Sequence, residues 1–135
     1  MLTAYIDGGS RGNPGPAGYG VRVEDEHGRP VAELSRALGA ATNNVAEYHA
    51  LVAALTWAAA HGCRSLRIKS DSELLVRQMR GEYRVRNAGL QPLYLEARRL
   101  VAELDRVRFE HIRRELNTEA DALANRAMDE ASGAR

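Results

Sequence analysis

Apolar and polar residues along the chain follow two spacings, one typical of strands and one of helices. The segments Leu2 to Asp7, Tyr19 to Glu24 and Pro30 to Leu38 carry the alternation or the bulky residues that favour strands. Turn residues separate the second segment from the third, so the three predict an antiparallel meander. The glycine- and proline-rich stretch from Gly8 to Gly18 predicts a loop between the first two strands.

The later part of the chain alternates between helical and strand-like segments. Ser65 to Ser70 and Arg106 to Ile112 alternate in the strand manner and predict a fourth and a fifth strand. Capping residues and closing glycines predict where helices begin and end. The first helix is an Ala- and Leu-rich run that begins at Thr42, Asn43 and Asn44 and closes at Gly62, and a short second helix is capped by Asp71 or Ser72 and ends near Gly81. The third runs from Leu90 to Leu104, and the fourth, capped by Asn117, runs from Thr118 to about Glu130.

The order of these elements, β-β-β-α-β-α-α-β-α, predicts an α/β fold built on a mixed sheet. Three antiparallel strands come first, and two parallel strands reached by helical crossovers follow. A chain of 135 residues is the length of one ordinary domain, so residues 1–135 are predicted to form a single domain.

Composition narrows the class of protein. The hydrophobic fraction of 44% and the charged fraction of 27% exclude a disordered chain. The run from Ala50 to Ala60 is far shorter than the roughly 20 residues that a membrane-spanning helix needs. The sequence shows no basic, apolar secretory leader, and Cys63 has no second cysteine to pair with. We therefore expect a cytoplasmic protein without membrane contact.

Four acidic residues stand at the ends of predicted elements. Asp7 ends the first strand and Asp71 ends the fourth, while Glu47 and Asp121 each lie about one turn into a helix. If the first and fourth strands are parallel neighbours, Asp7 and Asp71 lie side by side at the carboxyl edge of the sheet. Two carboxylates about 4 Å apart near a protein surface repel by about 4 kcal/mol. A cation or raised pKa values must relieve such a cluster.

Clustered oxygen donors without a cysteine or a clear histidine pair favour Mg²⁺ or Mn²⁺ over Zn²⁺. Two such ions suit phosphoryl transfer, in which one activates water and the other stabilises the leaving oxygen. An alternative stays open at this point. Each acid could simply start a turn or sit in the first turn of a helix, where the helix dipole favours negative charge.

The residues around these acids resemble ribonuclease H of type 1. Four segments match in order: YIDGGSRGNPGPAGYG around Asp7, TNNVAEYHAL around Glu47, IKSDSELLVRQM around Asp71 and RELNTEADALAN around Asp121. The resemblance extends from Leu2 to about Asp129. It implies the ribonuclease H-like fold, a five-stranded mixed sheet flanked by helices. It also implies that these four acids bind two divalent ions.

The resemblance further implies an activity. Members of this family cleave the RNA strand of RNA/DNA hybrids and leave 5′-phosphate and 3′-hydroxyl ends. We therefore hypothesise a monomeric endoribonuclease that depends on two Mg²⁺ or Mn²⁺ ions. Two other hypotheses remain: a non-catalytic nucleic-acid-binding module of the same fold, and another polynucleotide-cutting enzyme of the same superfamily.

The resemblance also assigns nucleic-acid contacts. Small residues after the first acid permit close approach to the 2′-hydroxyls of RNA, while hydroxyls and amides near a helix start suit phosphate and minor-groove edges. For Asn43 and Asn44, helix capping alone is the competing interpretation. The residues assigned to these contacts are Gly8, Gly9, Ser10, Asn13, Thr42, Asn43 and Asn44.

The chain departs from the family pattern in two places. The segment HIRRELNTEAD is shortened, and Arg114 resembles an arginine of other shortened members. Because arginine keeps its proton, Arg114 would neutralise phosphate charge or assist product release rather than act as a base. Gly81 to Gly89 replaces a basic insertion, with Arg84 and Arg86 as modest substitutes. This leaves double-stranded RNA open as a second substrate.

Overall fold

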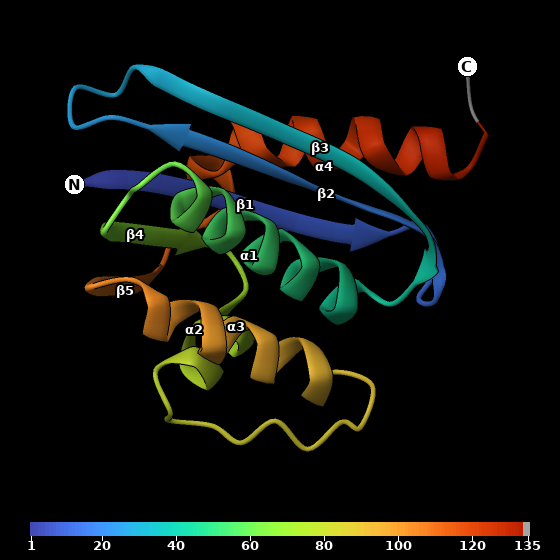
Figure 1. Ribbon diagram of the computed structural model, residues 1–135. Helices are drawn as coiled ribbons and strands as arrows, with labels where there is room; N and C mark the ends of the chain where they lie inside the picture. Colours follow the sequence, from blue (N-terminus) through green and yellow to red (C-terminus); the bar gives the residue numbers. More distant parts are fainter. Residues whose placement is uncertain (134–135) are drawn as a thin grey trace.

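A five-stranded sheet with the order β3-β2-β1-β4-β5 forms the centre of the computed structural model, which describes residues 1–133 (Figure 1). β1 pairs antiparallel with β2 and parallel with β4, β2 pairs antiparallel with β3, and β4 pairs parallel with β5. This confirms the predicted mixed sheet. The strands are β1 Leu2–Ser10, β2 Gly15–Glu24, β3 Pro30–Ala41, β4 Ser65–Ser70 and β5 Arg106–His111.

Helices cover both faces of the sheet. α1 packs against β1 and β2 on one face and against α3, while α4 packs against β1, β2 and β3 on the other face (Figure 1). No helix within residues 1–133 is long and apolar enough to cross a membrane. The helices are α1 Asn43–Ala60, α2 Glu73–Met79, α3 Gln91–Glu103 and α4 Thr118–Ala131, with a short 3₁₀ helix, η1, at Arg114–Leu116.

The main core lies between α1 and the sheet. Alternate residues of the central strands face α1 and are fully buried, whereas their neighbours on the other face are not. Removing a large aliphatic side chain from water contributes roughly 1.5–3 kcal/mol. The fully buried aliphatic residues of this layer include Ile6, Val21, Leu51, Leu55, Leu66 and Ile68.

The predicted loop from Gly8 to Gly18 is wrong for most of its length. β1 continues to Ser10 and β2 begins at Gly15, and Ser10 pairs with Ala17. Asp7 therefore lies inside β1 rather than at its end. The glycines are needed because helices approach the strands closely: a Cβ at Gly8 would lie 2.4 Å from the carbonyl group of Ala46 in α1.

Gly20 plays the same role beneath α4, which leads to a stability prediction. A Cβ there would lie 2.5 Å from the carbonyl oxygen of Ala120 and 2.5 Å from the Cβ of Leu123. We expect Gly20→Ala to lower the free energy of unfolding by about 1–3 kcal/mol, since overpacking forces α4 away from β2. Urea denaturation measures this. Gly89→Ala, at an exposed position, is the control, and equal stability of both variants would contradict the close contact.

Two helix caps agree with the sequence and one does not. Thr42 caps α1 by accepting a hydrogen bond from the Val45 amide, and Ser72, one of the two predicted candidates, caps α2 through the Leu75 amide. Asn117 stands at the N-cap of α4, but its side chain makes no capping bond. It is buried and instead donates to the carbonyl oxygen of Ile6 at 2.9 Å, because β1 passes beside the start of α4.

Candidate active site

Asp7 and Asp71 follow the same register position on neighbouring parallel strands. The last pair between β1 and β4 joins Ile6 to Ser70; Asp7 is the next residue within β1, and Asp71 directly follows the end of β4. Because Ser72 caps α2, the carboxylate of Asp71 is free of that task. The structure thus places the two acids at one point of the sheet edge, as the sequence predicts.

Glu47 and Asp121 reach this point from helices on opposite faces of the sheet. The close approach of α1 at Gly8 places Glu47 beside β1, since the amide nitrogen of Glu47 would lie only 2.6 Å from a Cβ at Gly8. On the other face, the bond from Asn117 to the Ile6 carbonyl joins the start of α4 to the residue before Asp7. Asp121 lies one turn further along α4.

The pKa of Asp7 is raised by burial and by the neighbouring acids. Burial, followed by the negative charges of Asp71 and Asp121, raises the pKa of Asp7 to about 8. A hydrogen bond with the Asp121 carboxyl and the charge of Glu47 raise it further. A carboxyl with such a pKa keeps its proton near neutral pH unless a cation replaces that proton.

The pKa of Glu47 is also raised. Burial and the charge of Asp71 raise its pKa to about 7, while hydrogen bonding by Ser72 and the positive charge of Arg114 oppose this rise. Arg114 in η1 is thus near enough to act electrostatically on the cluster. The sequence predicted an arginine beside the acids at this position, and its role there stays a prediction.

The donor set fits a hard divalent cation. The acids of this cluster supply only oxygen atoms, and their mutual repulsion is the electrostatic condition that a bound cation relieves. Among residues 1–133, no group of three or more His, Cys, Asp or Glu side chains is arranged as a ready-made metal site. Cation binding therefore requires these side chains to turn toward a common centre, and Asp7, whose pKa is raised, to give up its proton.

The predicted nucleic-acid contacts gather where the β1–β2 turn meets the start of α1. Asn43 Oδ1 accepts from the Ser10 amide at 2.8 Å, and Asn13 Oδ1 accepts from the Asn43 amide at 3.0 Å. The Asn43 side chain therefore ties the turn to α1 instead of capping the helix, while Asn44 lies exposed in the first turn. Gly8 is required by α1 packing, so substrate approach is not needed to explain it.

Sequence reasoning missed two residues that support the acids. The sequence predicts a helix cap at Asn117 and gives no signal for its bond to the Ile6 carbonyl of β1. Asn125 donates to Asp121 Oδ2 at 3.1 Å and orients that carboxylate. The four-residue spacing from Asp121 to Asn125 within one helix is the signal that would have found it.

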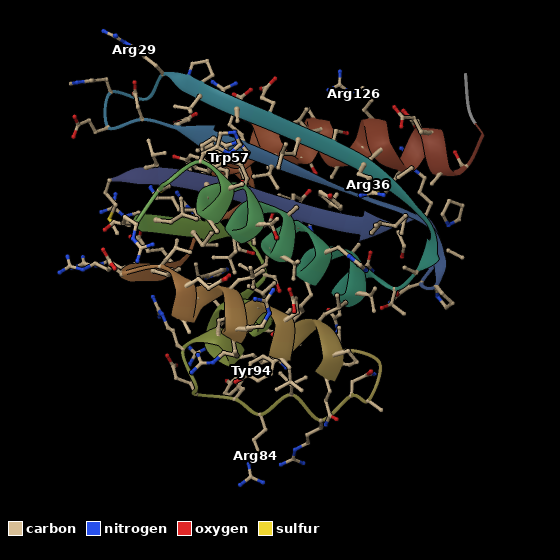
Figure 2. All side chains as sticks on the ribbon, viewed as in Figure 1. Arg29, Arg36, Trp57, Arg84, Tyr94 and Arg126 are labelled. Carbon is tan, nitrogen blue, oxygen red and sulfur yellow. The ribbon has the colours of Figure 1, made fainter. Side chains whose placement is uncertain are left out.

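The segment that replaces the basic insertion forms an exposed rim. Arg84 and Arg86 border a groove of about 430 Å³ together with Leu74 and Tyr83. Figure 2 shows Arg84 pointing away from the body of the molecule. The ring of Tyr83 lies 5.4 Å from the Arg77 guanidinium. Glu82 also borders this groove, so its carboxylate offsets part of the positive charge of Arg84 and Arg86.

This chain is similar in sequence to known proteins. A family model described as reverse transcriptase-like matches residues 5–127. The bifunctional protein Rv2228c of Mycobacterium tuberculosis is 47% identical over 127 residues, which are 93% of this chain and 35% of that protein. A ribonuclease H of Phenylobacterium zucineum is 35% identical over 149 aligned positions that cover 99% of this chain and 94% of that protein.

Solved structures show the same similarity in three dimensions. The N-terminal RNase H domain of Rv2228c superposes with a TM-score of 0.93 at 44% identity and covers 98% of both chains. LC11-RNase H1, solved in complex with an RNA/DNA hybrid, superposes with a TM-score of 0.92 at 42% identity, over 98% of this chain and 99% of that one. The present chain spans about a third of the length of the mycobacterial relatives.

Proposed function

The chain belongs to the ribonuclease H family, and from this premise we propose that it is an endoribonuclease that hydrolyses the RNA strand of RNA/DNA hybrids. The observation that carries the proposal is the placement of four acids, Asp7, Glu47, Asp71 and Asp121, where the β1–β4 pairing ends, α1 meets β1 and the start of α4 is bonded to β1. A hybrid complex of the similar LC11-RNase H1 supports the choice of substrate.

The four acids would hold two Mg²⁺ or Mn²⁺ ions, which supply Lewis acidity for activating water and stabilising the leaving oxygen. Asn117 fixes β1 against α4 and so holds Asp7 near Asp121. Asn125 orients the carboxylate of Asp121. In the proposed hydrolysis a water oxygen bonds to phosphorus while the bond to the 3′ oxygen breaks. The ends are then a 5′ phosphate and a 3′ hydroxyl.

Substrate would lie across the junction of the β1–β2 turn and α1. The hydroxyl of Thr42 and the amides at the start of α1 suit a phosphate, and Asn13, Asn43 and Asn44 carry groups that suit minor-groove edges. Ser10 and the glycines beside it present backbone to the 2′-hydroxyls of RNA. Arg114 would neutralise charge on the scissile phosphate or its product.

A substrate panel tests this function. Purified protein is incubated with labelled RNA/DNA hybrid, double-stranded RNA, single-stranded RNA and branched DNA, each with Mg²⁺, Mn²⁺ or a chelator. We expect RNA cleavage in the hybrid with either metal and none with chelator. Cleavage of double-stranded RNA would add a second substrate. It is included because only Arg84 and Arg86 stand where a basic insertion would bind the DNA strand. Intact hybrid beside folded protein would end the proposal.

Asn43→Ala tests the substrate junction. The change removes the acceptor for the Ser10 amide, so the β1–β2 turn is no longer tied to α1. We expect KM for the hybrid to rise about tenfold, equivalent to about 1.4 kcal/mol of binding, with kcat changed little. Steady-state kinetics measure the two constants. Thr56→Ala, exposed on the same helix, is the control, and an unchanged KM in Asn43→Ala would remove Asn43 from the binding surface.

A further inference from the structure

One face of the sheet is only partly covered. α4 packs on β1, β2 and β3, and the same face of β4 and β5 lies beyond it. Leu66 and Ile68 of β4 are fully buried on the face of the sheet that carries α1 and α2, so the alternating residues Arg67 and Lys69 project from the partly covered face. The side chains of this outer half are exposed or half-buried.

Strand register places arginines of β5 on that same face. Arg67 pairs with Arg108, and Ser65 pairs with Arg106. We call Arg67, Lys69, Arg106 and Arg108 the β4–β5 cationic face. Arg67 is neutralised by Glu110 at 2.9 Å. Within residues 1–133, no ion pair joins Arg106 or Arg108 to a carboxylate.

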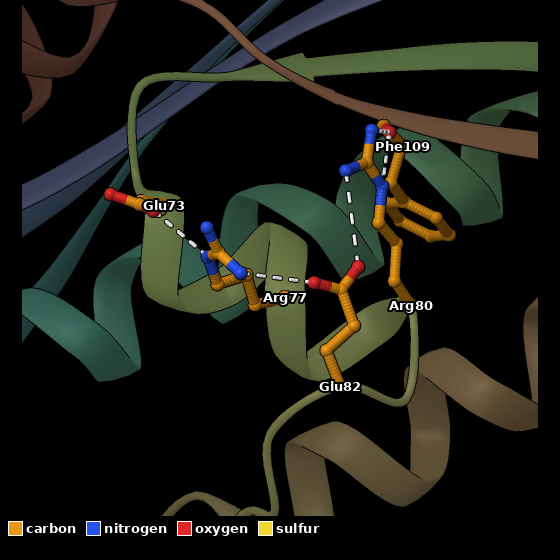
Figure 3. A network of polar contacts seen from close by, with 5 residues as sticks. All are labelled: Glu73, Arg77, Arg80, Glu82 and Phe109. Carbon is orange, nitrogen blue, oxygen red and sulfur yellow. Dashed lines mark hydrogen bonds and ion pairs between the residues drawn. The ribbon is translucent and has the colours of Figure 1, made fainter.

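Further positive charge continues around the edge of β5. Arg108 borders a cavity of about 510 Å³ that Arg80 and Arg98 also line. Figure 3 shows the Arg80 guanidinium on the Phe109 carbonyl, with Glu82 3.9 Å away. Arg98 donates to the Met79 carbonyl at 3.0 Å. Carbonyl groups hold both guanidinium groups in place; Glu82 offsets part of the charge of Arg80, and among residues 1–133 no ion pair joins Arg98 to a carboxylate.

The β4–β5 cationic face also adjoins the acid cluster. Tyr5 and Asp7 alternate on β1 and project from the same face as Lys69 of β4, and Asp71 directly follows the end of β4. The Lys69 ammonium lies 5.5 Å from the centre of the Tyr5 ring. An aromatic ring beside a row of cations on an open sheet suits stacked bases and a phosphate backbone.

We propose that the β4–β5 cationic face binds a single-stranded extension of the substrate as it leaves the active site. The proposal rests on the proposed ribonuclease function and adds a second contact surface to it. Continuity with the acids favours nucleic acid over an acidic protein partner. The acidic residues Glu24, Asp25 and Glu26 share a pocket with Arg67 at the other end of this face, and their negative charge disfavours a polyanion there.

The test compares a blunt 12-base-pair RNA/DNA hybrid with the same hybrid carrying ten uridines at the 5′ or the 3′ end of the RNA. For the unaltered protein we expect at least one extension to lower KM by about fivefold. In the double variant Arg106→Glu, Arg108→Glu, this gain should disappear while cleavage of the blunt hybrid persists. The gain should also fall steeply with salt, because it depends on phosphate contacts.

The matched control is the double variant Arg29→Glu, Arg126→Glu, which changes net charge equally at exposed positions away from β5 (Figure 2). It should keep the gain from the extension. Equal KM values for blunt and extended hybrids, or a gain that survives in Arg106→Glu, Arg108→Glu, would overturn the proposal. Failure to cleave even the blunt hybrid would instead refute the proposed function, so the two failures are distinguishable.

Discussion

Asp71→Asn will lower hybrid cleavage by about a thousandfold or more, equivalent to at least about 4 kcal/mol of transition-state stabilisation. The amide has nearly the shape of the carboxylate but no negative charge, so the variant keeps the fold and loses one of the proposed cation ligands. Its position beside Asp7 at the end of the β1–β4 pairing makes Asp71 central to the cluster. Initial rates on a labelled hybrid measure the loss.

Two controls separate this loss from a general defect. Thermal unfolding should show a fully folded variant, and binding of uncleaved hybrid should persist because the β1–β2 turn and α1 are unchanged. Asp105→Asn removes one exposed carboxylate that pairs with Arg64 at 2.8 Å, and it should cleave normally. Full activity of Asp71→Asn would show that the reacting groups lie elsewhere.

Asp7→Asn will stabilise the cation-free protein at alkaline pH. The pKa of Asp7 is about 8 in the folded chain against an ordinary value of 3.8. Because the folded state holds this proton more tightly, the contribution of Asp7 to stability is fully present below about pH 4 and is lost as pH rises toward 8. The asparagine side chain cannot ionise, so the variant escapes this loss. At pH 9 we expect a gain on the order of 3 kcal/mol.

Urea denaturation in chelator at pH 5 and pH 9 measures the effect. The stability of the unaltered protein should fall between these pH values more steeply than that of Asp7→Asn. Saturating Mg²⁺ should then stabilise the unaltered protein more than the variant, since a ligand that binds the folded state raises stability. Parallel pH dependence of the two proteins would mean that Asp7 ionises normally and stands apart from the other acids.

The mixed sheet could be predicted because alternation and capping agree along most of the chain. The position of Asp7 beside Asp71 also followed from topology, since β1 and β4 are parallel neighbours and both acids come directly after their last pair, although β1 itself continues past Asp7. The boundaries around Gly8 and Gly18 could not be predicted from composition. Glycine marks turns, but it also marks strands on which a helix packs closely, and a Cβ at Gly18 would lie 2.5 Å from the Cβ of Ala127.

The supporting residues of the site were harder to predict than the acids. The sequence predicts a cap at Asn117 because asparagine is common at the N-cap position. In the structure its side-chain amide instead donates a hydrogen bond to the Ile6 carbonyl of β1. Its Oδ1 is buried without a partner among residues 1–133. The side chain of Asn43 likewise does not cap α1; its Oδ1 accepts a hydrogen bond from the Ser10 amide. Local preference identifies the residue type, while the partner depends on segments distant in sequence.

Calorimetric titration of Mn²⁺ into the protein at pH 8 tests most directly whether the four carboxylates form one cation site. The unaltered chain should bind Mn²⁺, and Asp7→Asn, Glu47→Gln, Asp71→Asn and Asp121→Asn should each weaken that binding at least tenfold, while Asp105→Asn leaves it unchanged. Mn²⁺ affinity that stays the same after any one of the four changes would contradict a shared site.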